Sequence, residues 1–200
     1  MLAPQGQLDK TIISLKANGM DSYVVKNGAE AKIKVLGLIP AGANVMTMTS
    51  VTLDALGIAK ELNESGNFDS VRTKLAKMDS KTQAREMRQM TTAPDYVVGS
   101  VHAVTEDGKI MIVSATGSQL PAYIYGAEKV VWVVGTHKIV KNIESARKRL
   151  QEYVLPLESE RANKVYNITT GSFIAKELII NREFTAGRIT IIFVPEIIGF

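Results

Sequence analysis

Hydroxyl side chains are concentrated in the segment Thr47–Leu53, which carries Thr47, Thr49, Ser50 and Thr52. An apolar, strand-like run precedes this segment and a helical pattern follows it, so the hydroxyls coincide with the free N–H groups of a helix start. Such a group of donors suits a phosphate or a carboxylate. The alternative is simple capping of the helix by Ser50, which accounts for one hydroxyl rather than four. The segment lacks the glycine-rich pattern of a P-loop or a dinucleotide site.

A second polar segment, Ser114–Gln119, lies between an apolar run and a short helical pattern. Its members Thr116, Gly117, Ser118 and Gln119 offer N–H, hydroxyl and amide donors to the same ligand. The alternative is an ordinary loop between a strand and a helix.

A third segment, Gly135-Thr136-His137-Lys138, follows the most apolar run of the chain. His137 could act as an acid or a base near neutral pH, and Lys138 could neutralise a carboxylate or a phosphate. The alternative is a histidine and a lysine exposed in a surface loop.

Two neighbouring carboxylates, Glu106 and Asp107, are further candidates for acid–base chemistry, with Glu106 the catalytic candidate of the pair. Asp107 is followed by Gly108 between two β-rich runs, and this is above all the pattern of a hairpin turn. His102 lies in a strand-like stretch and is favoured as a hydrogen-bonded structural residue.

Composition restricts the cofactors and partners that we expect. The chain has no Cys and only two His, which excludes Cys-ligated zinc, iron–sulfur clusters and a three-His metal site within these 200 residues. We expect no metal and no bound cofactor. The net charge of +4 is mild and scattered, so nucleic acid is not an expected partner. A small anionic metabolite is compatible with it.

The amino-terminal residues lack the basic segment and apolar run of a signal peptide, and no apolar stretch approaches the length of a membrane span. We therefore expect a cytoplasmic protein with no membrane contact. A homodimer is a further expectation, from the apolar strand content.

Strand-like runs alternate with helical patterns along the chain, which predicts an α/β fold. We expect an open, mainly parallel, Rossmann-like sheet with helices on both faces and hairpin strands at one edge. The chain is expected to form one domain over residues 1–200, with an N-terminal helix in residues 1–20 and a helical cover over the sheet in residues 65–92. The expected strands are Tyr23-Val24-Val25, Asn44–Met48, two or three runs within Asp95–Ser114, Val130–Val134, Glu177–Ile180 and Ile189–Val194.

Ligands of open parallel sheets bind beyond the carboxyl ends of the strands. The three polar segments described above are each expected at such an end, so we expect them to converge.

Several phrases of the sequence, taken in order, resemble the LUD domain of bacterial lactate-utilization proteins, in a less-characterised, Cys-free branch. They are Ile39-Pro40 with Gly42 and Val45, Ser50-Val51-Thr52-Leu53 with Leu56-Gly57-Ile58, Val104-Thr105-Glu106-Asp107-Gly108, Gly117-Ser118-Gln119, Val133-Val134-Gly135 with Lys138-Ile139-Val140, Ala146 and Arg149, and Pro156-Leu157 with Arg161.

This resemblance implies a fold similar to the ribose-phosphate isomerase and CoA-transferase (NagB/RpiA/CoA transferase-like) superfamily. It also implies that Thr47–Leu53 corresponds to the loop that binds phosphate or carboxylate groups there. Lactate-utilization systems oxidise lactate to pyruvate and pass electrons to iron–sulfur subunits, which implies redox proteins as partners.

Two functions remain open from the sequence, beside a purely structural role in which side chains would close the pocket. The first is an accessory or small-anion-binding subunit linked to organic-acid metabolism. The second is a stand-alone enzyme acting on a sugar phosphate, an acyl-CoA or a similar anion, which would need Glu106, Asp107, His137 and Lys138 to converge on Ser50.

Overall fold

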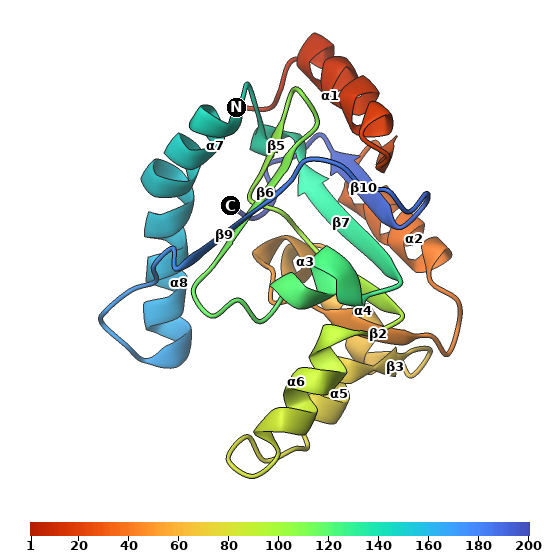
Figure 1. Cartoon of the computed structure of the whole chain (residues 1–200), viewed down its shortest axis with the longest axis vertical. Helices are drawn as coiled ribbons and strands as arrows, with labels where there is room; N and C mark the ends of the chain where they lie inside the picture. The colour runs from red at the N-terminus through yellow and green to blue at the C-terminus, as the bar shows by residue number, and fades with distance from the viewer.

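The computed structural model describes all of residues 1–200 and is built around a six-stranded sheet in which every neighbouring pair is parallel. This confirms the predicted α/β class with a mainly parallel sheet (Figure 1). The strands lie in the order β1 (Asp21–Val24), β10 (Ile189–Val194), β7 (Lys129–Gly135), β4 (Tyr96–Gly99), β2 (Asn44–Thr47) and β3 (Asp69–Ser70).

The central strand β7 is buried on both faces because its apolar residues alternate between two separate cores. Val131 and Val133 face the core formed with helices α2 (Gly28–Leu38), α3 (Val51–Ala55) and α4 (Ile58–Glu64). Val130, Trp132 and Val134 face the opposite core. Such a run can pair only in the middle of a sheet.

A second sheet of four strands covers much of that opposite face. It consists of β8 (Ile139–Val140), β5 (Ala103–Thr105), β6 (Ile110–Ser114) and β9 (Lys176–Ile180). The predicted hairpin is thus present as β5 and β6, but it belongs to a sheet of its own and not to one edge of the parallel sheet. Helix α1 (Gln5–Ala17) and the π-helical turn η1 (Ala122–Gly126) complete the cover.

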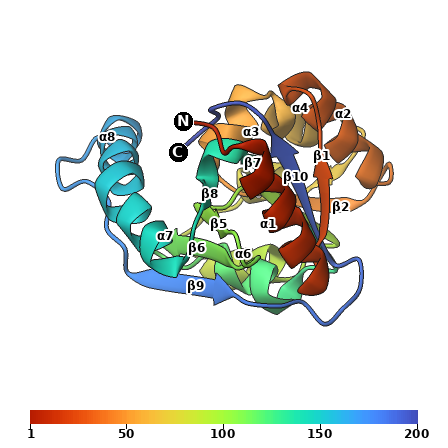
Figure 2. The same ribbon diagram turned by 90° about the horizontal axis from the view of Figure 1, so that it is seen from above.

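Strand β6 forms its own layer because both of its faces are apolar. Ile110 and Ile112 contact the core of the parallel sheet, whereas Met111 and Val113 contact a third cluster together with the helical rod described next. Figure 2 shows the resulting layers, with α2 to α4 on one side and α7, α8 and β9 on the other.

A helical rod consists of α7 (Ile143–Arg149), the π-helical segment η3 (Leu150–Val154) and α8 (Leu155–Tyr166). Asn142 caps its start by accepting a hydrogen bond from Ser145 N at 2.9 Å. The sequence predicts a new helix at Pro156, but the chain continues without a break. Proline has no N–H to donate, and the wider turn of η3 directly before it lets the backbone pass with the helix intact.

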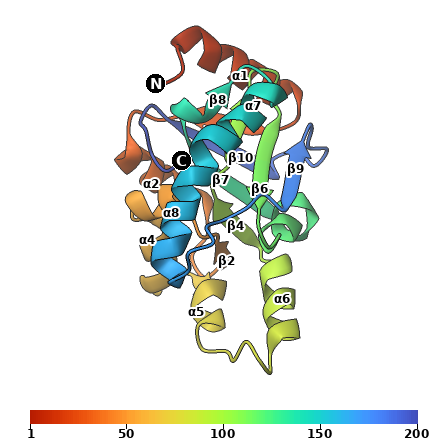
Figure 3. The ribbon, with the colours of Figure 1, turned by 90° about the vertical axis from the view of Figure 1, so that its left-hand side faces the viewer.

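Two short helices, α5 (Val71–Leu75) and α6 (Ala84–Thr92), lie beside the β2 and β3 end of the parallel sheet (Figures 1 and 3). They occupy the region 65–92 in which the sequence predicts a helical cover over the sheet, but only α5 contributes a buried residue, Val71, that packs against the sheet. α6 contains no buried residue, so it projects from the body of the molecule.

Strand β1, expected to be buried, is largely exposed because it forms the edge of the sheet. No helix is both long and apolar enough to cross a membrane.

The connections of the parallel sheet run in opposite directions from β2 and β4. From β2 the chain moves outward to β3, whereas from β4 it moves inward to β7 and then β10. The carboxyl ends of β2 and β4 therefore flank the point where the strand order reverses, which is the usual ligand position in such sheets.

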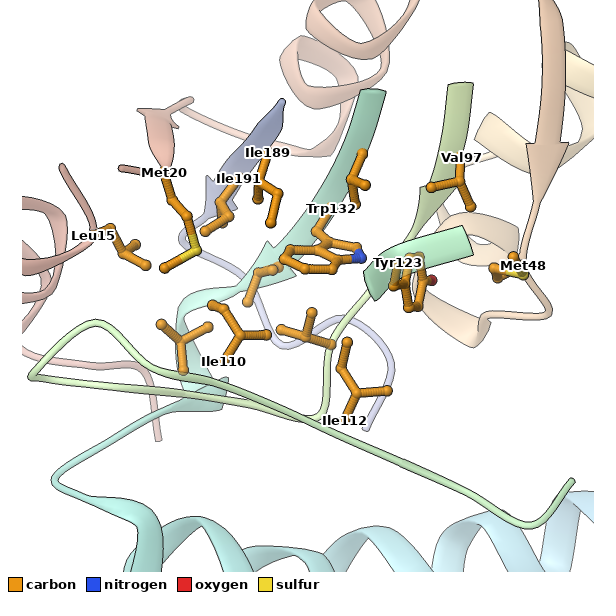
Figure 4. Close-up of a cluster of buried hydrophobic side chains, with 14 of the residues drawn as sticks. Leu15, Met20, Met48, Val97, Ile110, Ile112, Tyr123, Trp132, Ile189 and Ile191 are labelled. Carbon is orange, nitrogen blue, oxygen red and sulfur yellow. The ribbon is translucent and has the colours of Figure 1, made fainter. Parts of the chain in front are cut away.

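Trp132 lies at the centre of the core between the two sheets, where it is fully buried (Figure 4). Its ring meets that of Tyr123 edge to face, with centroids 5.3 Å apart. Gly99 allows this approach, because a Cβ atom there would collide with the Tyr123 hydroxyl.

We predict that Trp132→Ala lowers the free energy of unfolding by about 3–5 kcal/mol, since it removes a fully buried ring and leaves a cavity. Urea denaturation followed by circular dichroism measures this loss. The control is Tyr125→Ala, which truncates a side chain that is 89% exposed and should change stability little. Equal losses in the two variants would contradict the position of Trp132.

Candidate functional site

A cavity of about 620 Å³ lies where the strand order reverses. The loops that follow β2 and β4 line it from the parallel sheet, the end of β6 lines it from the second sheet, and α8 closes it from the side. The three sequence segments expected to converge all contribute: Thr49–Thr52, Ser114–Gln119 except Gly117, and Lys138.

Lys138 is the central side chain of this site. It ends the 3₁₀ turn η2 (Thr136–Lys138) that follows β7, and it is 1% exposed. Its Nζ donates hydrogen bonds of 3.1 Å to Thr52 Oγ1 and of 3.1 Å to Ser100 Oγ. Both acceptors are neutral hydroxyls, and no carboxylate pairs with the ammonium group.

The buried environment of Lys138 disfavours its charged form. Burial, reinforced by the positive charge of Arg149, lowers the pKa of Lys138 from 10.5 to about 7. Two guanidinium nitrogens of Arg149 are themselves buried without a hydrogen-bond partner. Lys138 and Arg149 are therefore two basic groups that act on each other, and neither is hydrogen-bonded to a carboxylate.

The hydroxyls of Thr47–Leu53 have separate roles. Thr47 does not line the cavity, because its Oγ1 is bonded to Asn63. Thr49 Oγ1 accepts from Arg72 at 3.2 Å. Ser50 Oγ accepts from Leu53 N at 3.4 Å, so it serves as the helix cap that was the alternative interpretation.

The helix that follows these hydroxyls, α3, is only five residues long. Its dipole adds little to the field, since a macrodipole needs several aligned turns. The basic groups at this edge of the sheet are instead the side chains of Lys138 and Arg72.

The loop Ser114–Gln119 is held mostly by its own hydrogen bonds. Gly117 N donates to Ser114 Oγ at 2.8 Å, and Ser114 Oγ donates to Gln119 Oε1 at 2.9 Å. Thr116 Oγ1 donates to Ser118 Oγ at 3.2 Å. Thr116 and Ser118 are exposed at the mouth of the cavity, where they can meet a ligand.

Sequence reasoning missed several polar residues of the cavity, among them Ser100, Arg72 and Arg161. Arg72 Nη2 donates to Thr47 O at 2.8 Å, and burial lowers the pKa of this guanidinium. Arg161 is paired with Glu158 at 2.6 Å, and that hydrogen-bonded contact raises its pKa. Ser100 follows β4 directly, and its position after an apolar run was the one signal available in the sequence.

The two histidines are neutral at physiological pH. Burial and the charges of Lys138 and Arg149 lower the pKa of His102 to about 3 and that of His137 to about 4. His102 lines the cavity, and its Nδ1 accepts from Val113 N at 3.3 Å. His137 lies outside the cavity, with Nδ1 3.3 Å from the carbonyl oxygen of Glu196.

The carboxylates Glu106 and Asp107 do not reach the cavity. Glu106 pairs with Lys10 of α1 at 2.8 Å, and Asp107 pairs with Lys109 at 2.7 Å within the hairpin turn. Hydrogen bonding to Lys10 lowers the pKa of Glu106, which keeps it ionised. Of the three catalytic candidates, Lys138 alone lines the cavity.

The carboxyl-terminal tail passes directly behind the site. Thr52 Oγ1 donates to Ile198 O at 3.2 Å, and Gly199 lies against Thr52 with a positive φ of 64°. Phe200 lines the cavity itself.

No group of three or more carboxylate or imidazole side chains that could hold a metal ion is present.

The pKa of Lys138 predicts how stability depends on pH. Between about pH 7 and 10.5 the folded state loses this proton while the unfolded state keeps it. The unfolded state then binds more protons, so the free energy of unfolding rises with pH, by up to about 1.4 kcal/mol per pH unit. Below about pH 7 both states are protonated and this dependence vanishes.

Urea denaturation of Lys138→Met at several pH values from about 7 to about 9 should lack this rise. The matched control is Lys141→Met, which removes an exposed lysine three residues further along and should keep the rise. If the free energy of unfolding depends on pH in the same way in the parent protein, in Lys138→Met and in Lys141→Met, the lowered pKa of Lys138 is contradicted.

One solved structure similar to this chain agrees with this fold. A DUF162 family protein from Deinococcus radiodurans, known from a crystal structure, superposes with a TM-score of 0.61 at 11% sequence identity, covering 97% of this chain and 99% of that one. A ribose 5-phosphate isomerase from Plasmodium falciparum gives a TM-score of 0.30 at 11% identity, covering 89% of this chain and 100% of that one. At these identities the first likeness concerns the fold alone.

No curated protein matches the chain. The family model of the LUD domain, however, matches residues 8–194, from α1 to the end of β10. Nearly the whole chain is thereby accounted for, so the protein belongs to the LUD domain family, the lactate-utilization family.

Proposed function

We propose that this chain is a cytoplasmic subunit that binds a small organic anion in the cavity at the carboxyl ends of β2, β4 and β7. One observation carries the proposal: two basic side chains, Lys138 and Arg72, line this cavity with no carboxylate hydrogen-bonded to either. A ligand carboxylate or phosphate would supply the missing partner.

The energetics favour such a ligand. A buried cation without a partner is costly, and a charge-assisted hydrogen bond from an anion offsets that cost. Asp54, which also lines the cavity, acts on Arg72 only through space. Ser100 and Thr52 hold Lys138 in place, while Thr116 and Ser118 at the mouth remain accessible to the ligand.

Membership of the LUD family supports an organic acid, such as lactate or pyruvate, as the ligand. The 200 residues contain no Cys, so an iron–sulfur cluster with cysteine ligands would have to be held outside them. We therefore propose an accessory role, in which the anion-loaded subunit associates with redox partner proteins.

The volume of the cavity favours a second candidate, an enzyme for a larger anion such as a sugar phosphate or an acyl-CoA. About 620 Å³ falls in the range of sites for drug-sized ligands, and a three-carbon acid would occupy a small part of it. Glu106 and Asp107, which this candidate required at the site, lie elsewhere, so Lys138 is the one residue of that set left at the cavity to serve as its acid or base.

A thermal-shift screen tests both candidates, with lactate, pyruvate, sugar phosphates and CoA as separate arms. A ligand at about 100 times its dissociation constant stabilises the folded state by roughly 2.7 kcal/mol. We predict that the double variant Ser50→Ala, Thr52→Ala abolishes the shift, since it releases the α3 cap and one partner of Lys138.

The control is Thr185→Ala, which removes an exposed hydroxyl far from the cavity and should leave the shift unchanged. A shift with lactate or pyruvate favours the organic-acid role, and a shift confined to the larger anions favours the enzyme. If no anion stabilises the protein, or if the double variant responds like the parent, the proposed site is wrong.

A further inference from the structure

The Nζ of Lys138 is the one amine that lines the cavity at the carboxyl ends of the strands. An ammonium group has three donors, and two of them are used by Thr52 and Ser100. The third N–H of the ammonium group has no partner within the chain. When the group loses this proton, a lone pair takes its place on the nitrogen. The cavity is the space through which a ligand can approach this amine.

The groups around Lys138 favour that neutral form. Arg149 is the charged group that acts on it, and His102 and His137, which also lie near, are themselves uncharged at neutral pH. No acid lies at hydrogen-bonding distance to restore the ammonium. A lysine that is desolvated beside another cation is the typical arrangement of an amine nucleophile.

We propose that Lys138 condenses reversibly with the carbonyl group of a 2-oxo acid or a similar anionic carbonyl compound, forming an imine within the cavity. This inference rests on the anion binding proposed above, in which Arg72 offers a partner for the carboxylate of the ligand.

The bonds and protons balance without any further reactant. The neutral amine attacks the carbonyl carbon, a C–N bond forms, and the carbonyl electron pair moves to oxygen, which takes up a proton. The nitrogen gives up a proton, which yields a neutral carbinolamine. A second proton then moves to its hydroxyl, the nitrogen lone pair forms the C=N bond as the C–O bond breaks and water leaves, and the resulting iminium releases its N–H proton to give the neutral imine. Both protons gained by the oxygen are thus matched by the two that the nitrogen loses. The hydroxyls of Ser100 and Thr52, each 3.1 Å from Nζ, are placed to relay these protons.

Reductive trapping tests this proposal on the intact protein. Pyruvate and, separately, pyridoxal phosphate are added at neutral pH with sodium cyanoborohydride, and the modified peptides are located by mass spectrometry. We expect one dominant adduct, at Lys138. Its rate of formation should rise with pH around an apparent pKa of about 7, as for the free amine of Lys138 and unlike a surface lysine.

Lys138→Met should lose the adduct, whereas Lys141→Met, the exposed neighbour, should keep it. If Lys138→Met does not fold, Ser100→Ala provides the test, because loss of the proton relay should slow trapping at Lys138 by at least about tenfold. Adducts scattered over surface lysines, or none at Lys138 with either carbonyl probe, would overturn the imine.

The thermal-shift screen separates this proposal from the proposed function. A shift with pyruvate but no adduct at Lys138 overturns the imine and leaves anion binding in place. The absence of both overturns the imine and removes the support for organic-acid binding.

Discussion

A single buried ammonium group joins the parts of the protein that surround the cavity. Lys138 follows β7, and its two hydrogen-bond acceptors belong to the helix after β2 and to the residue after β4. The three strand ends are therefore connected through one nitrogen atom. Because both acceptors are neutral hydroxyls, the connection fixes the position of the amine without supplying a counter-charge, and the proposed binding of an anion rests on this.

The cavity exists because two sheets and a helical rod meet without filling the space between them. β6 is apolar on both faces, so it separates the core of the parallel sheet from the core against α7 and η3. The end of β6 is thereby brought opposite the end of β2. Neither sheet alone would enclose a ligand, and α8 closes the side that both leave open.

The sequence was sufficient for the parts of the fold that rest on local patterns. Apolar runs such as Val130–Val134 marked the central strands, and hydroxyls at the start of α3 marked one wall of the cavity. The separate second sheet was not predictable. A strand that is apolar on both faces, such as β6, has the same sequence pattern whether it lies inside the parallel sheet or forms a layer of its own. Arg72 and Arg161 were missed because each reaches the cavity from a helix whose sequence reads as an ordinary charged surface.

The tail behind Thr52 has a practical consequence for handling the protein. Phe200 lines the cavity, and the carbonyl oxygen of Ile198 accepts a hydrogen bond from Thr52, the residue whose hydroxyl also holds Lys138. This tail is therefore part of the cavity wall. A purification tag joined directly to Phe200 would therefore be attached to a residue of the cavity wall. A tag ahead of the exposed residue Met1 would avoid this, and material prepared in the two ways should be compared before a negative binding result is accepted.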